Sequence, residues 1–237
     1  ERLMDTPLVE AIDVHRIYRP SATVEVHALR GVSLSIHRGD SLAIIGPSGS
    51  GKSTMLNLLG ALDRPTSGSM LFGGRDVNNL SDVDLARLRN EQIGFVFQSF
   101  HLLSRATALD NVALPLVYRG LGRRERRERA HAALAAVGLA DRVDHRPNEL
   151  SGGQQQRVAI ARAMVTEADM LLADEPTGNL DTRTGTEVLE LLTSLQADRG
   201  AALVVITHDQ LVADMVDQVI ETRDGVLEQP ARTGRRS

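Results

Sequence analysis

The sequence predicts an α/β fold built on a mostly parallel sheet. Short apolar runs of strand length alternate with stretches of helical periodicity, the arrangement expected when crossover helices join parallel strands. One apolar run, residues 42–45, is followed by a glycine-rich loop that opens a helix; the loop reads Gly46-Pro47-Ser48-Gly49-Ser50-Gly51-Lys52-Ser53-Thr54. Because crossover helices lie against a parallel sheet, we expect helices on both of its faces.

Length and composition limit the possible domain organisation and the possible classes of protein. A chain of 237 residues is long for one average domain and short for two, so we expect one core with an inserted subdomain. The net charge of -4 gives no global reason to expect nucleic acid, and the absence of cysteine excludes disulfides and thiolate chemistry. No apolar run approaches the roughly 18 residues of a membrane span, and the N-terminus has no signal-peptide pattern. We therefore expect a soluble protein.

Residues 1–98 are expected to form the first part of the core. Residues 26–36 alternate apolar and polar side chains, which is typical of a half-buried strand. Pro65 to Gly68 and the pair Gly73-Gly74 are turn signals that separate neighbouring elements. The expected elements are strand 8–17, strand 26–36, strand 42–45, helix 52–62, strand 69–73, helix 81–92 and strand 93–97.

From residue 99 to about 157 the pattern becomes mainly helical, with a helix start at Thr107 and a helix stop at Gly138. The arginine-rich run 123–129 contains interspersed glutamates, which favour a solvated helix face over a nucleic-acid site. After this insertion we expect helix 154–166, strand 170–173, helix 184–198 and strand 202–207. The predicted organisation is one domain with core 1–98 and 158–230, helical subdomain about 99–157 and tail 231–237.

The glycine-rich loop predicts phosphate binding. Its glycines let successive backbone N–H groups turn toward an anion, and the following helix directs its positive end to the same point. Lys52 is placed to reach the β- and γ-phosphates, and Ser53 has the hydroxyl and the position to bind Mg²⁺. The alternative is a glycine-rich turn with an unrelated lysine. The nucleotide-binding residues expected in this loop are Gly46, Ser48, Gly49, Ser50, Gly51, Lys52, Ser53 and Thr54.

Leu150-Ser151-Gly152-Gly153-Gln154 precedes a second helix. Ser151 and Gln154 have the spacing of a capping box, so a helix cap is one interpretation. The two glycines also expose N–H groups at the positive end of a helix dipole, which suits a second anion.

A pair of acidic residues, Asp174 and Glu175, follows the apolar run 170–173. Such a pair can simply be a turn. After a phosphate loop, we expect Asp174 to reach Mg²⁺ and Glu175 to polarise the attacking water. The chain thus has two anion sites and one set of catalytic residues. The spare site would serve the nucleotide of a second copy, in a head-to-tail homodimer with two-fold symmetry.

Together these motifs resemble the ATP-binding-cassette (ABC) ATPases over about residues 8–228, because the sequence 150–154 matches that family's signature. The resemblance implies a phosphate-loop NTPase (RecA-like) core, an N-terminal antiparallel β subdomain and a helical insertion. It also implies roles for residues whose isolated motifs are weak. Gln98 would sense Mg²⁺ and the transport partner, His208 would contact the γ-phosphate, Tyr18 would stack on adenine, and the loop from Gly178 to Asp181 would cross the dimer interface.

Three longer stretches, 60–68, 95–103 and 172–181, are similar to the branch that contains macrolide exporters, lipoprotein-release ATPases and cell-division ATPases. The resemblance implies ATP hydrolysis with Mg²⁺, a homodimer in the ATP-bound state and an integral-membrane permease as partner. It places the protein in the cytoplasm, peripheral on the inner face of the membrane.

Two other functions are left open by the motifs. One is a cassette of a cell-division or regulatory complex that translocates nothing, since the same motifs serve both. The other is a cassette acting on nucleic acid or ribosomes. Proteins of that kind usually carry tandem cassettes or a long coiled coil, for which this sequence has no room, so no nucleic acid is expected.

Overall fold

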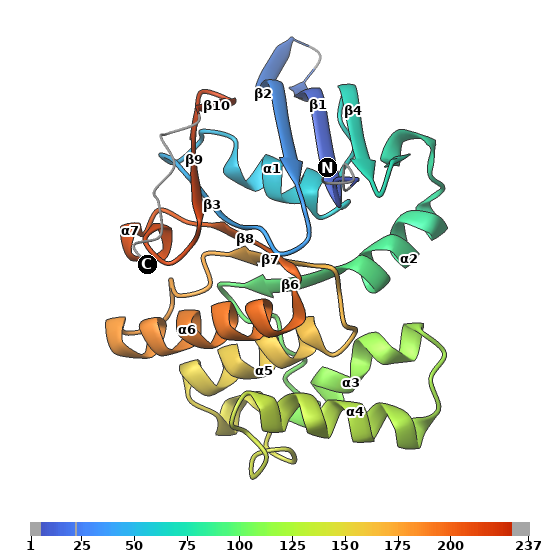
Figure 1. Ribbon diagram of the computed structural model, residues 1–237, viewed down its shortest axis with the longest axis vertical. Helices are drawn as coiled ribbons and strands as arrows, with labels where there is room; N and C mark the ends of the chain where they lie inside the picture. Colours follow the sequence, from blue (N-terminus) through green and yellow to red (C-terminus); the bar gives the residue numbers. More distant parts are fainter. Residues whose placement is uncertain (1–5, 22, 229–237) are drawn as a thin grey trace, which may run out of the picture. The chain divides into compact units, whose positions relative to one another are not determined.

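The computed structural model describes residues 6–21 and 23–228. The described residues divide into two compact units: the first combines residues 6–21 and 23–88 with 202–228, and the second is residues 89–201. Figure 1 labels the helices and strands. The predicted helical subdomain of about 99–157 falls within the second unit. Its boundaries stay a prediction, and the predicted tail 231–237 lies outside the described residues.

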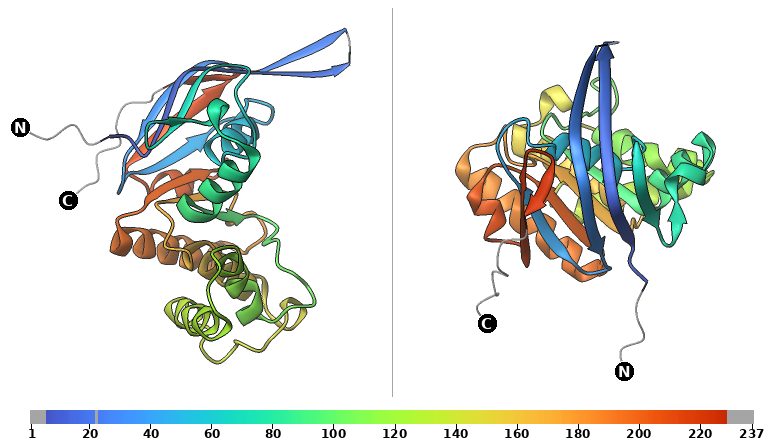
Figure 2. Two further views of the ribbon diagram at one scale, coloured as in Figure 1. Left: turned by 90° about the vertical axis from the view of Figure 1, so that its right-hand side faces the viewer. Right: turned by 90° about the horizontal axis from the view of Figure 1, so that it is seen from above.

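An antiparallel sheet forms one part of the first unit. Its strands, in the order β2-β1-β4-β5, are β1 (Val9–Ser21), β2 (Val24–Ile36), β4 (Ser67–Phe72) and β5 (Arg75–Asp76). Val32 and Ile36 on β2 are buried whereas Ser33 and Ser35 are exposed, as the alternating pattern predicts. The β1–β2 hairpin extends beyond the other strands of this sheet (Figure 2). The antiparallel β subdomain is therefore confirmed.

A second set of strands in the first unit is mainly parallel. The central strand β3 (Ser41–Ile45) pairs in parallel with β8 (Ala202–Ile206) and β9 (Gln218–Arg223), and β10 (Val226–Glu228) is antiparallel to β9. All five residues of β8 are buried. The sequence analysis predicts β3 and β8 but not β9 and β10, because β9 has only two adjacent apolar residues and β10 is three residues long.

The first unit also contains α1 (Lys52–Leu59), the short 3₁₀ helix η1 (Val77–Asn79) and α7 (Gln210–Ala213); α2 (Asp82–Gln92) leads into the second unit. Helix α1 ends three residues earlier than the predicted residue 62. Gly60 caps it, and Ala61 adopts a left-handed φ of 49°. The N–H groups of Leu62 and Asp63 then both donate to the Asn57 carbonyl, so the chain turns back instead of continuing the helix.

The second unit contains the parallel pair β6 (Ile93–Phe97) and β7 (Met170–Asp174). Its helices are α3 (Ala108–Tyr118), α4 (Arg123–Ala136), the 3₁₀ helix η2 (Pro147–Glu149), α5 (Gly152–Met164) and α6 (Thr182–Arg199). Helices α3, α4 and α5 pack on one another around Leu116, Leu134 and Ile160, which are fully buried. Burial of these side chains supplies the apolar core of this unit.

The arginine-rich run lies on the solvent-facing side of α4, as predicted. Ala130, Leu134 and Val137 are buried, and two of the arginines pair with glutamates one turn away on the same helix. Among the helices formed by the described residues, none combines the length and apolarity that a membrane crossing needs.

Candidate functional site

The phosphate loop connects β3 to α1 and depends on glycine at two positions. Gly46 has a φ of 154° and Gly51 a φ of 105°. A Cβ atom on Gly46 would lie 2.3 Å from the carbonyl oxygen of Thr222, and one on Gly51 would lie 2.6 Å from that of Ala28. Larger residues therefore cannot occupy these positions without moving the neighbouring backbone.

The β9–β10 hairpin holds this loop in place. The Thr222 hydroxyl donates to the Ser50 carbonyl at 2.9 Å, and the Gly225 N–H donates to the same oxygen at 3.0 Å. Neither residue is a site residue in the sequence analysis. The pair Asp224-Gly225, with φ values of 50° and 81°, is a recognisable hairpin turn signal that could have located them.

Donors at the phosphate loop have few partners in the protein itself. The N-cap of α1 is Gly51, which offers no side-chain hydrogen bond to the first turn. The Lys52 ammonium lies back over its own loop and donates to the carbonyls of Gly46 (2.7 Å) and Pro47 (2.9 Å). The buried Ser50 hydroxyl has no hydrogen-bond partner within the described residues. Of the other loop residues, Ser48, Gly49 and Ser53 are exposed to solvent, whereas Thr54 is buried. An anion at this position would satisfy several of these donors.

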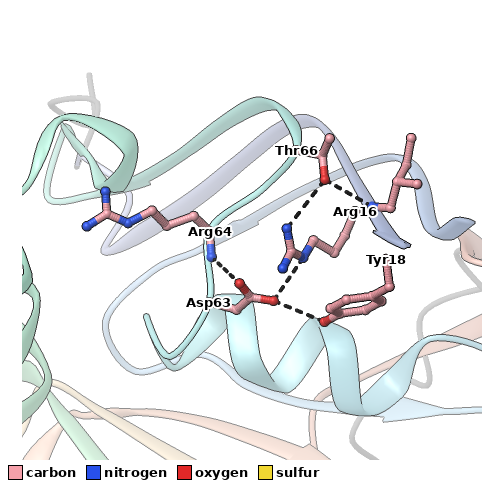
Figure 3. Close-up of polar contacts among 6 residues, drawn as sticks. Arg16, Tyr18, Asp63, Arg64 and Thr66 are labelled. Atoms are coloured by element: carbon pink, nitrogen blue, oxygen red, sulfur yellow. Dashed lines mark hydrogen bonds and ion pairs between the residues drawn. The ribbon is translucent and has the colours of Figure 1, made fainter. Parts of the chain in front are cut away.

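Tyr18 lies in a polar cluster of the first unit (Figure 3). Its hydroxyl donates to the Asp63 carboxylate at 3.0 Å, and Arg16 Nε donates to the same oxygen at 2.8 Å. The Arg16 guanidinium carbon also lies 4.5 Å from the centre of the Tyr18 ring. A base that stacks on Tyr18 would therefore use the opposite ring face. Arg16 and Asp63 are not predicted as site residues from the sequence, because their contacts join residues about 45 positions apart.

His208 follows the end of β8. The Thr207 N–H donates to the Ile44 carbonyl at 3.2 Å, which places the end of β8 beside the end of β3, where the phosphate loop begins. Thr207 is buried and His208 is exposed. His208 thus lies at the same sheet edge as the loop within the first unit.

In the second unit, the carboxyl ends of β6 and β7 bring three predicted site residues together. Phe97 pairs with Asp174 in the parallel register, so Gln98 and Glu175 both follow at the same edge. Glu175 is half-buried and has a left-handed φ of 46°. For a residue other than glycine this conformation costs about 1–3 kcal/mol and is found preferentially at functional sites.

Gln98 contacts the loop that begins at Gly178. Its side-chain N–H donates to Asn179 Oδ1 at 3.3 Å, and Asn179 Nδ2 donates to the Gln98 carbonyl at 2.9 Å. The loop ends at Asp181, whose carboxylate caps α6 by accepting from the Thr184 N–H at 3.1 Å. Hydrogen bonds from Thr184 lower the pKa of the Asp181 carboxyl. Asp181 thus also has a purely structural role.

The second anion site begins α5, and the predicted capping box is confirmed there. The Gln154 N–H donates to the Ser151 hydroxyl at 3.3 Å, and the Ser151 N–H donates to Gln154 Oε1 at 2.9 Å. Gly152 is half-buried. Gly153 is buried, and a Cβ atom there would lie 2.4 Å from Thr184 Cγ2. Close packing against the start of α6 therefore also requires glycine at position 153.

Buried Gln156, further along α5, is missed by the sequence analysis. Its Nε2 donates to the Pro176 carbonyl at 2.7 Å, which fixes the chain just after Glu175. A polar residue within a helix has no local sequence signal that distinguishes it from a solvated one, so only the structure identifies this contact.

The donor chemistry of the proposed metal ligands suits Mg²⁺. Within the described residues, no three or more His, Asp or Glu side chains form a cluster that could hold a metal ion. Ser53, Gln98 and Asp174 offer oxygen donors of the kind Mg²⁺ prefers, and Mg²⁺ usually binds through one or two carboxylates, here that of Asp174, together with waters and substrate phosphates. The residues therefore fit a metal that arrives with a nucleotide.

Known proteins are similar in sequence to nearly the whole chain. The model of the ABC transporter family matches residues 29–178. An uncharacterized ABC transporter ATP-binding protein of Thermotoga maritima is 53% identical over 227 residues, which is 96% of each chain. The macrolide export ATP-binding/permease protein MacB of Salmonella choleraesuis is 50% identical over 222 residues, 94% of this chain but only 34% of MacB.

Solved structures agree with the sequence comparisons. A dimeric structure of the ATP-binding cassette MJ0796, in a post-hydrolysis state bound to ADP and Pi, has a TM-score of 0.86 at 42% identity. The match covers 94% of this chain and 98% of that one. The fold of the chain thus matches that of an ATP-binding cassette.

Proposed function

Because this chain belongs to the ABC transporter family, we propose that it dimerises around two Mg²⁺-ATP and drives a membrane permease. ATP hydrolysis is the activity of this family, and the chain is an ATP-binding ATPase. The proposal concerns three further properties: the role of each site residue, the dimeric assembly and the membrane partner.

The observation that carries the ATP site is the set of incompletely satisfied donors at the phosphate loop. Helix α1 begins without a side-chain cap, the buried Ser50 hydroxyl has no partner among the described residues, and Lys52 donates only to carbonyls of its own loop. We assign Lys52 and His208 to the γ-phosphate and Tyr18 to the base, which it would contact with the ring face opposite Arg16.

For hydrolysis we assign Ser53, Gln98 and Asp174 to Mg²⁺, which would neutralise charge on the phosphates. Glu175 would accept a proton from the attacking water. Its left-handed backbone and the hydrogen bond from Gln156 to the next residue, buried Pro176, support a fixed position of this part of the main chain at the end of β7.

The proposed dimer uses the second anion site. Ser151 and Gly153 of one copy would complete the site that binds the nucleotide of the other, and the loop 178–181 would lie at the interface. Support comes from the dimeric structure of the MJ0796 cassette and from the presence of two expected anion sites with only one set of expected catalytic residues in the sequence.

The proposed partner is an integral-membrane permease for export, lipoprotein release or mechanical transmission. MacB, whose name combines an ATP-binding part with a permease, supports an exporter-like role, and the matched region is 34% of that protein. The protein would then lie on the cytoplasmic face of the membrane through its permease. The contact surface would include Phe100, Leu102 and Leu103, of which Leu103 is 52% exposed.

The assembly is tested with Glu175→Gln. This variant should bind ATP normally but turn over about 10²–10⁴-fold more slowly, because a general base is lost. Light scattering with Mg²⁺-ATP should then detect a dimer, whereas the unmodified protein with ADP should be mainly monomeric. A monomer under the trapping conditions would contradict the head-to-tail dimer.

A further inference from the structure

The segment that follows Gln98 contains an uncommon backbone corner. Phe100 and His101 are consecutive, neither is glycine, and their φ values are 58° and 48°. Bulky residues rarely adopt this left-handed conformation, so surrounding contacts must hold it in place. The Phe100 N–H donates to the Phe97 carbonyl at 3.1 Å, and the rings of Phe97 and His101 lie 4.8 Å apart. These local contacts close the corner on one side.

Arg162, in the last turn of α5, closes it on the other side. Its guanidinium donates to the His101 carbonyl at 2.5 Å and to the Phe100 carbonyl at 2.8 Å. The side chain is half-buried and forms no ion pair with any described carboxylate, and burial lowers the pKa of its guanidinium. The partly desolvated guanidinium of Arg162 thus forms hydrogen bonds with two backbone oxygens of the corner.

The chemistry of this contact requires arginine. Two parallel N–H groups of a planar guanidinium can reach two successive carbonyl oxygens at once, whereas a lysine ammonium acts as a point charge without that fixed fork. Elsewhere in the segment, buried Asn111 accepts from the Leu103 N–H at 2.7 Å, and Asn179 holds Gln98. Of these three polar contacts, only the one from Arg162 comes from α5.

The two ends of α5 therefore contact two different sites. Ser151 caps its N-terminus, and Arg162 lies eleven residues further on, about 16 Å along a helix axis. We infer that Arg162 is a positioning residue: it holds the Phe100–His101 corner, so that α5 transmits movement of the second anion site to the segment between Gln98 and Leu103. This inference rests on the proposed function, in which that segment meets both Mg²⁺ and the permease.

Hydrogen–deuterium exchange of the full chain tests the hold on the corner. Arg162→Lys should raise the exchange rate of the amides in 99–103 about tenfold, because a bidentate charged contact is lost. Arg157→Lys is the matched control. Arg157 lies on the same helix and donates to the Val137 carbonyl at 3.3 Å, away from the corner. Unchanged exchange in 99–103 for Arg162→Lys, or an equal increase for both variants, would overturn the inference.

Transmission along α5 is tested in the Glu175→Gln background. Adding Mg²⁺-ATP should lower exchange in 99–103 when Arg162 is present and should lower it less than half as much in Arg162→Lys. Equal protection in the two proteins would overturn the transmission. If Glu175→Gln does not dimerise, the proposed assembly fails. The exchange comparison without nucleotide still decides whether Arg162 holds the corner.

A merely structural arginine would lower the melting temperature without changing the response to metal. We therefore expect Arg162→Lys to raise at least threefold the Mg²⁺ concentration for half-maximal ATPase activity, whereas Arg157→Lys leaves it unchanged. An unaltered Mg²⁺ response in Arg162→Lys would restrict Arg162 to stability and contradict a positioning role.

Discussion

Helices α1 and α5 both begin beside glycines, but their first turns are satisfied in opposite ways. The N-cap of α1, Gly51, has no side chain to offer, whereas Ser151 and Gln154 at the start of α5 exchange two hydrogen bonds. An uncapped first turn surrounded by a glycine loop leaves donors for a ligand. A first turn capped by its own side chains is stable without a ligand, so a phosphate at α5 is not needed to satisfy the cap.

In the proposed dimer, this difference would account for a first site that binds nucleotide within a single chain and a second site that acts on the nucleotide of another copy. The phosphate loop brings its own lysine and a buried hydroxyl without a partner in the described residues. Among the described residues, the start of α5 offers a phosphate the helix dipole, Ser151 and the backbone of two glycines. We expect the first site to determine nucleotide affinity and the second to determine whether hydrolysis proceeds.

The largest effect should follow Lys52→Ala. Removing the ammonium deletes charge-assisted hydrogen bonds worth about 1.5–3 kcal/mol each, so the Kd for Mg²⁺-ATP should rise about a hundredfold or more. Isothermal titration calorimetry measures it. Arg87→Ala, which removes an exposed cation from α2, is the control and should leave the Kd unchanged. Normal ATP affinity in Lys52→Ala would mean that this loop is not the phosphate site.

The next effect separates hydrolysis from binding. Ser151→Arg places a bulky cation at the second site without touching the phosphate loop. Hydrolysis should fall about 10²-fold or more, as when a transition-state donor is removed, while the ATP affinity of the monomer stays within about twofold. Ser151→Ala separates the two roles of this residue. It removes the hydroxyl that caps α5, at a cost of about 1 kcal/mol of stability, without adding a cation, so hydrolysis should fall less than in Ser151→Arg.

A loss of ATP affinity in monomeric Ser151→Arg would contradict the proposed difference between the two anion sites, since both sites would then bind the same nucleotide. The steady-state ATPase rate and the equilibrium affinity must be measured on the same preparation. Only their ratio distinguishes a damaged second site from a general loss of folded protein.

The sequence predicts most of what depends on local patterns and little of what depends on distant contacts. The phosphate loop, the Ser151 capping box and the strand-end position of Asp174 follow from spacing alone. The contacts of Ser50 with Thr222 and of Tyr18 with Asp63 join residues 172 and 45 positions apart. The Asp224-Gly225 turn signal indicates the hairpin that contains Thr222, but no local pattern pairs either residue with its distant partner.

Differences between the predicted and the observed helices and contacts have similar causes. Helix α1 is predicted to reach residue 62 because its periodicity continues, but Gly60 and the left-handed Ala61 end it at Leu59. Gln156 and Arg162 lie within an amphipathic helix, where their composition resembles that of a solvated face. Both side chains donate to backbone carbonyls of segments distant in the sequence, and these contacts are visible only in the folded structure.

The smallest effect concerns the glycines of α5 and distinguishes packing from ligand binding. A Cβ atom on Gly153 would lie 2.4 Å from Thr184 Cγ2, whereas one on Gly152 would lie 3.3 Å from the end of Leu180. Gly153→Ala should therefore lower the free energy of unfolding by about 1–3 kcal/mol, as overpacked sites do. Gly152→Ala should change it by less than about 1 kcal/mol, because alanine's better helix propensity offsets the tight contact.

Urea denaturation of the two variants measures this difference, and titration of each with Mg²⁺-ATP completes the test. Both should bind ATP as the unmodified chain does, because neither glycine belongs to the phosphate loop. If Gly153→Ala were as stable as Gly152→Ala, Thr184 would have room to move. Glycine at position 153 would then have to be explained by the nucleotide of the second copy, and the two helix starts would differ less than their hydrogen bonds indicate.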